Sequence, residues 1–499
     1  MTKVLLLPLD ERPCNYDFPR LMSLECPDIA LHEPPMNILG EKKSPGDFDK
    51  ISVWLKENAT DCDCAVLSVD MLVYGGIVPS RLHHMTKQEA IQRLGVLREI
   101  KRAAPSLKIY AFSLIMRAPA YDSSEEEPLF YDLYGRKLYE LGCLTDRKER
   151  HGLTQEEDAA MAACIKAIPE EVLQEFTNRR AVNHAVNEEA VKLLEEGVVE
   201  FLVIPLDDCA AYGWAAREQR RLRMRIAQRR LSNKVYLYSG ADEVGSILLA
   251  RALNEARNEN PAVYLQYSSV QGPLVIPAYE DRPLGENLKW QIAAAGGHTC
   301  FCAEDADFIC MVNAPTAGGE RMAQAETREE DMDSSYFSQR CLPEFASALR
   351  AFSKRKPVAL ADVSKANGAD NELMDILLAE NLIPCLSSYS GWNTAANAAG
   401  TCIAHMMLTK GAGNGSFTAL RLMEDWGYMA NVRKQALTWI EERGGGYFDL
   451  KGYEPQLCAY VLSQMRAWGL SHSVPGAERL QAVQYPWHRL FEVSLLFED

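Results

Sequence analysis

The sequence predicts an α/β fold with mainly parallel strands, and a (β/α)8 TIM-like barrel is the specific expectation. Two observations support this fold class. Short β-branched or aliphatic runs recur along the chain, and each is followed by a loop and then by a helical pattern. Polar side chains also gather where these runs end. Repeated strand–loop–helix units of this kind form parallel sheets with helical crossovers.

Nine runs are expected to be strands, which is one more than an eight-stranded barrel needs. One of them would then be an extra strand, and the sequence leaves open which. In chain order the predicted strands cover residues 4–7, 65–69, 109–115, 201–204, 235–238, 263–267, 308–312, 358–361 and 383–386.

The barrel is expected to occupy residues 1–405, with a helical insertion at about 121–199 between the third and fourth strands. That segment is longer than one crossover requires. Its last helix could bring Arg180, His184 and Asn187 to a ligand, or it could present a solvated face. Residues 406–499 are expected to form a mainly helical C-terminal domain, because long helical patterns there surround a triple-glycine break at 444–446.

Composition limits the classes of protein and partner. The chain has 499 residues, 47% hydrophobic and 24% charged, as is typical of a globular protein. Its net charge of −16 argues against a nucleic-acid partner, because the phosphate backbone is also negative. No run of about 18 apolar residues occurs, so no membrane span is expected. The 14 cysteines are scattered and expected to be reduced, and the N-terminus does not resemble a signal peptide, so a cytoplasmic protein is predicted.

The two adjacent carboxylates Asp207 and Asp208 are the most informative site residues. They directly follow the apolar run at 201–206, so they are expected at the rim of the sheet. Two like charges this close readily retain a proton, which suits acid–base chemistry. Either aspartate alone could instead cap the following helix.

Other strands also end in polar groups, and ligands bind at the carboxyl ends of parallel strands. Arg12, Arg117 and Trp392 are the least easily explained as ordinary turn residues. We therefore predict a substrate-binding set made of Asp10, Glu11, Arg12, Asn15, Asp70, Arg117, Tyr212, Asp242, Glu243, Asn313, Trp392 and Asn393.

Glycoside hydrolysis normally uses two carboxyl groups on opposite sides of the bond. In a barrel, Asp208 on the fourth strand could be the acid, but the seventh strand offers Asn313 in place of a second carboxylate. This favours a substrate-assisted route, in which the 2-acetamido oxygen of the sugar attacks the anomeric carbon. Asp207 would orient the acetamide and Asp208 would protonate the leaving group.

Two resemblances bear on this interpretation. The segments Pro8-Leu9-Asp10-Glu11-Arg12-Pro13, Gly240-Ala241-Asp242-Glu243 and Gly391-Trp392-Asn393-Thr394 resemble a bacterial family catalogued as a domain of unknown function. Asp207-Asp208, Arg12-Pro13 and Asn313-Ala314-Pro315 resemble, more weakly, the barrel β-N-acetylhexosaminidases and O-GlcNAcases. The second resemblance implies a retaining glycosidase. The aromatic-rich segment that precedes the asparagine in that group is missing here, which leaves the acetamide pocket without its usual walls.

The sequence thus predicts a β-N-acetylhexosaminidase acting on a small carbohydrate with a terminal GlcNAc or GalNAc. Neither zinc-ligand spacing nor a nucleotide-binding glycine loop is present, so no metal and no cofactor are expected. A homo-oligomer is the one protein partner left open. Two alternatives remain: a hydrolase of phosphate or amide substrates using a divalent cation among Asp10, Asp70, Asp207 and Asp242, and a non-catalytic sugar-binding protein.

Overall fold

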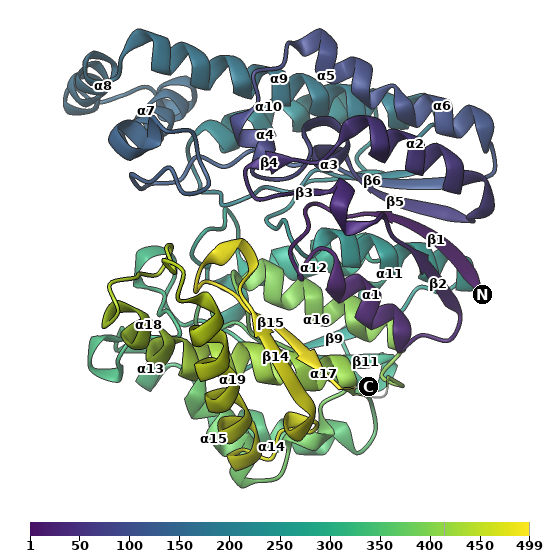
Figure 1. Cartoon of the computed structure of the whole chain (residues 1–499), viewed down its shortest axis with the longest axis vertical. Coiled ribbons are helices and arrows are strands. Elements are labelled where there is room, and N and C mark those ends of the chain that lie inside the picture. Colours follow the sequence, from purple (N-terminus) through teal and green to yellow (C-terminus); the bar gives the residue numbers. More distant parts are fainter. Residues whose placement is uncertain (414, 499) are drawn as a thin grey trace. The chain divides into compact units, whose positions relative to one another are not determined.

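The computed structural model describes residues 1–413 and 415–498, which form two compact α/β units. Unit 1 consists of residues 1–11, 28–252 and 279–281, and unit 2 consists of residues 12–27, 253–278 and 282–499. The chain therefore leaves unit 1 after Glu11, returns at Asp28, and leaves again within helix α11 (Val244–Arg257). Each unit has its own parallel sheet (Figure 1).

Unit 1 has a six-stranded parallel sheet in the order β2-β1-β5-β6-β7-β8. Its strands are β1 (Thr2–Leu7), β2 (Ile29–His32), β5 (Cys64–Ser68), β6 (Lys108–Phe112), β7 (Phe201–Val203) and β8 (Val235–Tyr236). All five residues of β5 are buried, as expected for a parallel strand covered on both faces. The strand order reverses between β1 and β5, and ligands of open α/β sheets bind at the carboxyl side of such a reversal.

Helices form the remainder of unit 1. The segment between β6 and β7, predicted as a helical insertion, holds the three helices α7, α8 and α9. A short hairpin of β3 (Gly40–Glu41) and β4 (Ser44–Pro45) precedes α2. The helices are α2 (Phe48–Asn58), α3 (Val69–Tyr74), α4 (Pro79–Leu82), α5 (Lys87–Leu94), α6 (Val96–Ala103), α7 (Tyr131–His151), α8 (Gln155–Ala167), α9 (Glu170–Glu195) and α10 (Trp214–Gln228).

Unit 2 has a five-stranded parallel sheet in the order β10-β9-β11-β12-β13. Its strands are β9 (Ala262–Tyr267), β10 (His298–Thr299), β11 (Phe308–Asn313), β12 (Val358–Asp362) and β13 (Ser388–Ser390). Here the order reverses between β9 and β11. Its helices are α1 (Asp17–Leu24), α12 (Leu284–Ala294), α13 (Ser335–Ser338), α14 (Leu342–Ser353), α15 (Asn371–Ala379), α16 (Ala395–Thr409), α17 (Ser416–Arg421), α18 (Arg433–Glu441) and α19 (Glu454–Ser471).

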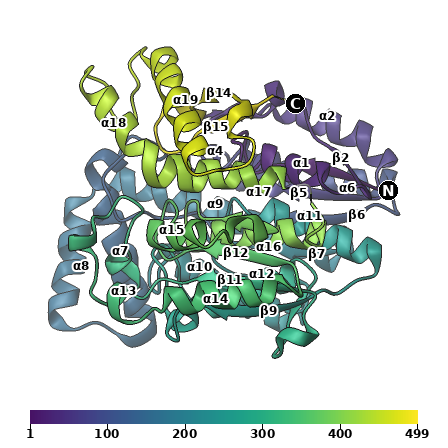
Figure 2. The same ribbon diagram turned by 90° about the horizontal axis from the view of Figure 1, so that it is seen from below.

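The C-terminal part of unit 2 contains a π-helix at Leu422–Val432 and an antiparallel pair, β14 (Leu480–Gln484) with β15 (Ser494–Phe497). Figure 2 shows α19 beside this pair, and α19 packs on β14. The boundary predicted near residue 405 falls inside unit 2, within α16. All fifteen residues of α16 are buried.

The α/β class with parallel strands is confirmed, but the eight-stranded barrel is not. Within residues 1–413 and 415–498 the parallel strands divide between two sheets, and no closed barrel occurs. Eight of the nine predicted strands are present. The ninth, at 383–386, is wrong: Ile383–Cys385 is a 3-10 turn, because Pro384 has no N–H to donate to a ladder, and β13 begins three residues beyond that turn.

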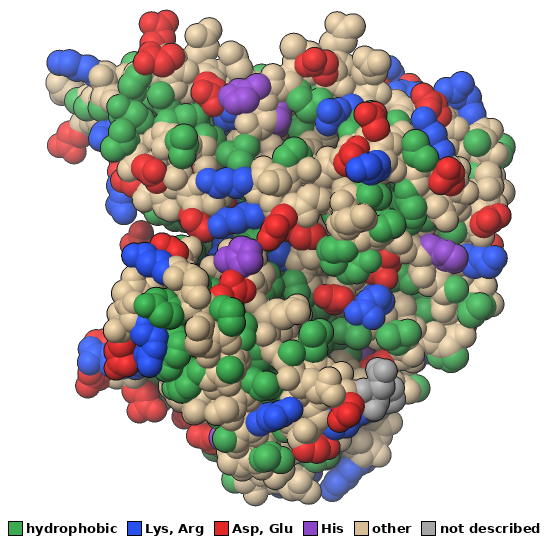
Figure 3. All heavy atoms as spheres, viewed as in Figure 1, with side chains coloured by type: hydrophobic (Ala, Val, Ile, Leu, Met, Phe, Trp, Pro, Cys, Tyr) green, Lys and Arg blue, Asp and Glu red, His purple; other side chains and the backbone are tan. Residues whose placement is uncertain are grey.

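The surface does not concentrate charge of one sign on the face drawn in Figure 3, where acidic and basic side chains are interspersed. None of the described helices is both long and apolar enough to cross a bilayer.

Candidate functional site

The Asp207-Asp208 pair lies at the carboxyl side of the unit 1 sheet. After β7, Leu206 still makes parallel bridges to Ile115 and to Ser239, and the two aspartates follow at once. Asp208 has a φ of +28°, a conformation that is strained for a residue with a side chain. The pair is thus fixed where the strand ends.

Each aspartate of the pair is held by a different buried arginine. Nη2 of Arg81 donates to Oδ2 of Asp207 over 2.7 Å, and Nη1 of Arg117 donates to Oδ2 of Asp208 over 2.8 Å. Arg117 belongs to the predicted set. Arg81 was not predicted, because it lies in the four-residue helix α4 and follows no strand.

Two glutamates of the loop before α7 join these arginines. Glu126 accepts from Arg81 over 3.0 Å and from Arg117 over 2.9 Å. Glu127 lies 2.8 Å from Nε of Arg117 and 3.4 Å from Nη1 of Arg81. Both glutamates lie near the beginning of the segment predicted as a helical insertion. We call the group the arginine–carboxylate cluster: Asp70, Arg81, Arg117, Glu126, Glu127, Asp207 and Asp208.

Asp70 is the third aspartate of the cluster. It lies in the first turn of α3, directly after β5, and accepts a hydrogen bond from the backbone N–H of Leu114 over 2.9 Å. Burial raises its pKa to about 7, and the charge of Asp207 acts in the same direction. A buried carboxyl group beside another carboxylate favours its protonated form, so Asp70 can retain a proton near neutral pH.

Replacing Asp70 with asparagine is expected to flatten the pH dependence of stability. The folded-state pKa of about 7 exceeds the unfolded value of about 4, so the folded protein holds the proton more tightly. That contribution is complete below about pH 4 and is lost as the pH rises through 7, at about 1.4 kcal/mol per pH unit. Urea unfolding of parent and variant between about pH 5 and 8 measures it. Parallel curves would contradict a raised pKa.

Asp208 differs from Asp207 in its environment. Burial is the main cause that raises the pKa of Asp208 to about 6, and the charge of Asp207 adds to it, while Arg117 acts in the opposite direction. Its side chain nevertheless remains 26% exposed, against 10% for Asp207. Asp208 is therefore the member of the pair that can both hold a proton and reach a ligand.

Helix α9 supports the strand end that carries Arg117. Arg180 donates to the backbone carbonyls of Met116 and Arg117 and pairs with Glu218 over 2.7 Å. Asn187 donates to the carbonyl of Leu114 over 3.1 Å. The sequence predicted that this face of the helix either contacts a ligand or is exposed to solvent. Neither prediction holds for Arg180 and Asn187. These side chains are buried and bind the backbone of the protein.

The other predicted site residues of unit 1 are not members of the arginine–carboxylate cluster. Asp10 and Asp242 are buried. Glu11 accepts from the backbone N–H of Lys42 over 2.7 Å, and Glu243 accepts from that of Ala241 over 3.0 Å. Tyr212 lies under the guanidinium groups of two arginines of α7, Arg147 and Arg150.

Unit 2 contains the remaining predicted residues. Asn313, at the end of β11, is fully buried and donates to Asp362 over 2.8 Å and to Asp370 over 3.2 Å. Arg340 forms an ion pair with Asp370, and Lys365 lies 3.4 Å from it. Asn313 thus belongs to a buried polar network that fixes the loop after β12.

Arg12, Asn15, Trp392 and Asn393 also lie in unit 2. Arg12 stacks over Trp487 and lies 3.9 Å from Glu492. Asn15 contacts the thiol of Cys14 over 3.5 Å. Asn393 has a φ of +68°, and its carbonyl accepts from the N–H of Asn367.

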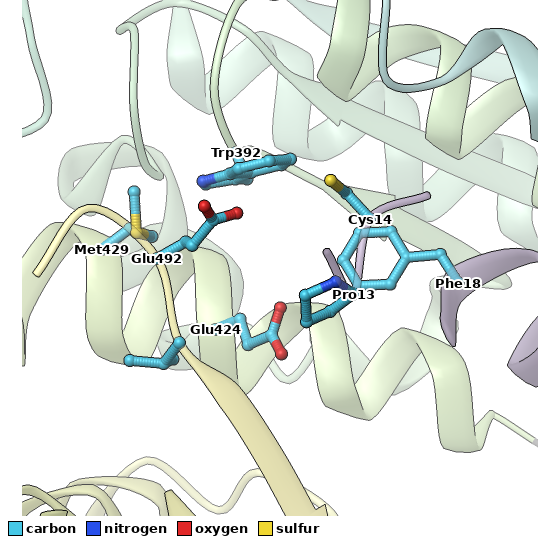
Figure 4. Close-up of a pocket in the computed structure, with 8 residues that line it drawn as sticks. Pro13, Cys14, Phe18, Trp392, Glu424, Met429 and Glu492 are labelled. Atoms are coloured by element: carbon cyan, nitrogen blue, oxygen red, sulfur yellow. The ribbon is translucent and has the colours of Figure 1, made fainter. Parts of the chain in front are cut away.

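Trp392 lines a pocket of unit 2 together with Pro13, Cys14, Phe18, Glu424, Met429, Glu492 and Val493 (Figure 4). Sequence reasoning found Trp392 and missed the two glutamates. Neither glutamate follows a strand of the parallel sheet, since Glu424 lies in the π-helix and Glu492 precedes β15.

The alternative of a divalent-cation site depends on several metal-ligating side chains lying close together. In residues 1–413 and 415–498, no group of three or more His, Cys, Asp or Glu side chains is arranged to hold a metal ion.

The fold and the cluster together define an α/β protein with two parallel-sheet units and a buried arginine–carboxylate site in the first. Over residues 4–496 the chain matches the family described as "Protein of unknown function (DUF4127)", and it belongs to that family. This confirms the first resemblance drawn from its sequence motifs. No curated protein and no solved structure matches the chain significantly.

Proposed function

We propose that this protein is a glycoside hydrolase that releases a terminal 2-acetamido sugar from a small carbohydrate in the cytoplasm. The observation that carries the proposal is the unequal environment of Asp207 and Asp208. One carboxylate is ion-paired to the buried Arg81, and its neighbour combines a pKa of about 6 with an exposed edge. Adjacent carboxyl groups with different protonation suit two different tasks in one reaction.

In the proposed reaction the acetamido oxygen of the sugar attacks the anomeric carbon, and the bond to the leaving oxygen breaks. Asp207, ion-paired with Arg81, accepts a hydrogen bond from the acetamido N–H and so orients the amide. Asp208 donates its proton to the leaving oxygen. Water then attacks the anomeric carbon, Asp208 takes the proton of that water, and the acetamide is restored with retained configuration.

Arg117 has a positioning role in this scheme. It binds Asp208 through one nitrogen and Glu126, Glu127 and the hydroxyl of Tyr121 through the others. This fixes the direction of the Asp208 carboxyl group. Positioning of this kind lowers the entropic cost of reaching the reactive geometry.

A screen of nitrophenyl glycosides tests the proposal. It should cover both anomers of GlcNAc and GalNAc and the matching sugars without an acetamido group. We expect turnover of the β-2-acetamido substrates only. Progressive fluorination of the acetamide should slow the reaction, because fluorine withdraws electrons from the attacking oxygen.

The outcomes separate the alternatives. Turnover restricted to sugars without the acetamido group would contradict substrate assistance. Loss of activity with a chelator would favour the metal-dependent hydrolase, and binding without turnover of any glycoside would favour a sugar-binding protein.

A further inference from the structure

The pocket around Trp392, which we call the Trp392 pocket, has features of a ligand site in unit 2. Its empty volume is about 260 Å³, part of it open to solvent, and its interior leaves about 10 Å³ for a water-sized group. Figure 4 shows the indole of Trp392 on one side and Glu424 on the other, with the carboxyl group of Glu492 between them. A space of this size takes about one hydroxyl group at its base.

The indole N–H of Trp392 is available for an acceptor. Trp392 is 6% exposed, and among the described residues its Nε1 has no hydrogen-bond partner. A buried polar group without a partner destabilises the protein. An acceptor supplied by a ligand would remove that cost.

The carboxylates of the pocket are balanced by arginines. Glu424 is ion-paired with Arg421, and Glu492 lies 3.1 Å from Arg489 and 3.9 Å from Arg12. The ligand therefore does not need to supply a positive charge. Each carboxylate has about four lone-pair positions, which is more than one guanidinium contact occupies.

The remaining walls are apolar. Pro13, Phe18, Met429 and Val493 line the pocket beside the indole ring. A ligand with hydroxyl groups on a hydrocarbon frame presents both surfaces at once, since its C–H groups meet these walls and its hydroxyls meet the glutamates.

We propose that the Trp392 pocket binds a hydroxyl-bearing arm of a neutral polyol or sugar. The indole N–H donates to the oxygen of the hydroxyl group that enters the base of the pocket, and Glu424 and Glu492 are the acceptors for that hydroxyl. This proposal does not depend on the glycosidase activity, because it concerns binding by residues of unit 2 and no bond is broken.

The indole N–H resonances of protein labelled with ¹⁵N-tryptophan test it directly. The chain has eight tryptophans, and Trp392→Phe identifies the resonance of Trp392 by its loss. Titration with glucose, N-acetylglucosamine or glycerol is expected to shift that resonance. Ethanolamine and acetate, as cationic and anionic probes, are expected to leave it unmoved. The other seven resonances report whether each variant is folded.

Variants sharpen the test. Glu492→Gln keeps the shape of the side chain but weakens its acceptance of hydroxyl groups, so the dissociation constant for glucose should rise about tenfold. Trp439→Phe is the matched control, since Trp439 packs on Tyr460 and does not line the pocket, and it should leave affinity unchanged. A Trp392 resonance that no neutral probe moves, or that only ethanolamine moves, would overturn the proposal. So would an unaltered affinity in Glu492→Gln.

Discussion

Asp208→Asn is expected to lower kcat by about 10²- to 10⁴-fold on a glycoside with a poor leaving group, such as an alkyl 2-acetamido glycoside. This is the usual contribution of a positioned general acid. Asparagine keeps the size of the side chain and can still meet Arg117, but it has no acidic proton. The loss should be smaller for nitrophenyl glycosides, because nitrophenolate leaves with little protonation.

The pH profile gives an independent readout of the same residue. The parent should lose activity as the pH rises through about 6, since the acid must be protonated and its pKa is raised to about 6. Asp208→Asn should lack this alkaline limb. Asp158→Asn, on the exposed surface of α8, is the control and should match the parent. Equal losses on alkyl and nitrophenyl glycosides would contradict the assignment of the acid.

Arg81→Met is expected to destabilise the protein by about 3–5 kcal/mol. Removing one partner of a buried ion pair leaves the other charge without compensation. Arg81 is 2% exposed and faces Asp207, Glu126 and Glu127, so its loss leaves three carboxylates with only Arg117 among them. Urea denaturation measures the change.

Arg98→Met is the matched control for that experiment. Arg98 also pairs with two glutamates, but its side chain is 28% exposed, and exposed pairs contribute about 0–1 kcal/mol. The double variant Arg81→Met, Asp207→Asn should recover part of the loss, because one uncompensated charge is removed. Equal effects of the two single substitutions would contradict a buried cluster.

The sequence was sufficient for eight of the nine predicted strands and for the class of fold, but it did not reveal β2 and β10 of the two parallel sheets. Apolar runs such as 64–68 and 308–313 favour a buried parallel strand when helical patterns follow them. It was insufficient for the arrangement of the strands. Whether nine runs close into one barrel or divide into two sheets depends on which strands pair, and pairing is set by contacts between residues far apart in the chain. The boundary predicted near 405 lies within α16 of unit 2.

The residues of the candidate site likewise fall into those that the sequence could indicate and those that it could not. Asp70, Arg117, Asp207 and Asp208 could be found because each follows a strand. Arg81 and Glu127 could not, because they reach the cluster from a short helix and a loop whose positions are fixed only by packing. Asn313 was placed with the substrate set by analogy with a barrel. In the structure it is fully buried, and its amide nitrogen donates to Asp362 and Asp370.

The passage of residues 12–27 into unit 2 has a consequence for synthesis on the ribosome. Helix α1 is made first, yet Phe18 packs against Phe417 and lies under the guanidinium of Arg421. About 400 residues separate them, which is about 20–80 s of elongation at about 5–20 residues per second. During that interval α1 lacks the residues that cover it. The nascent chain therefore exposes the apolar face of α1 until about five-sixths of the chain has been translated.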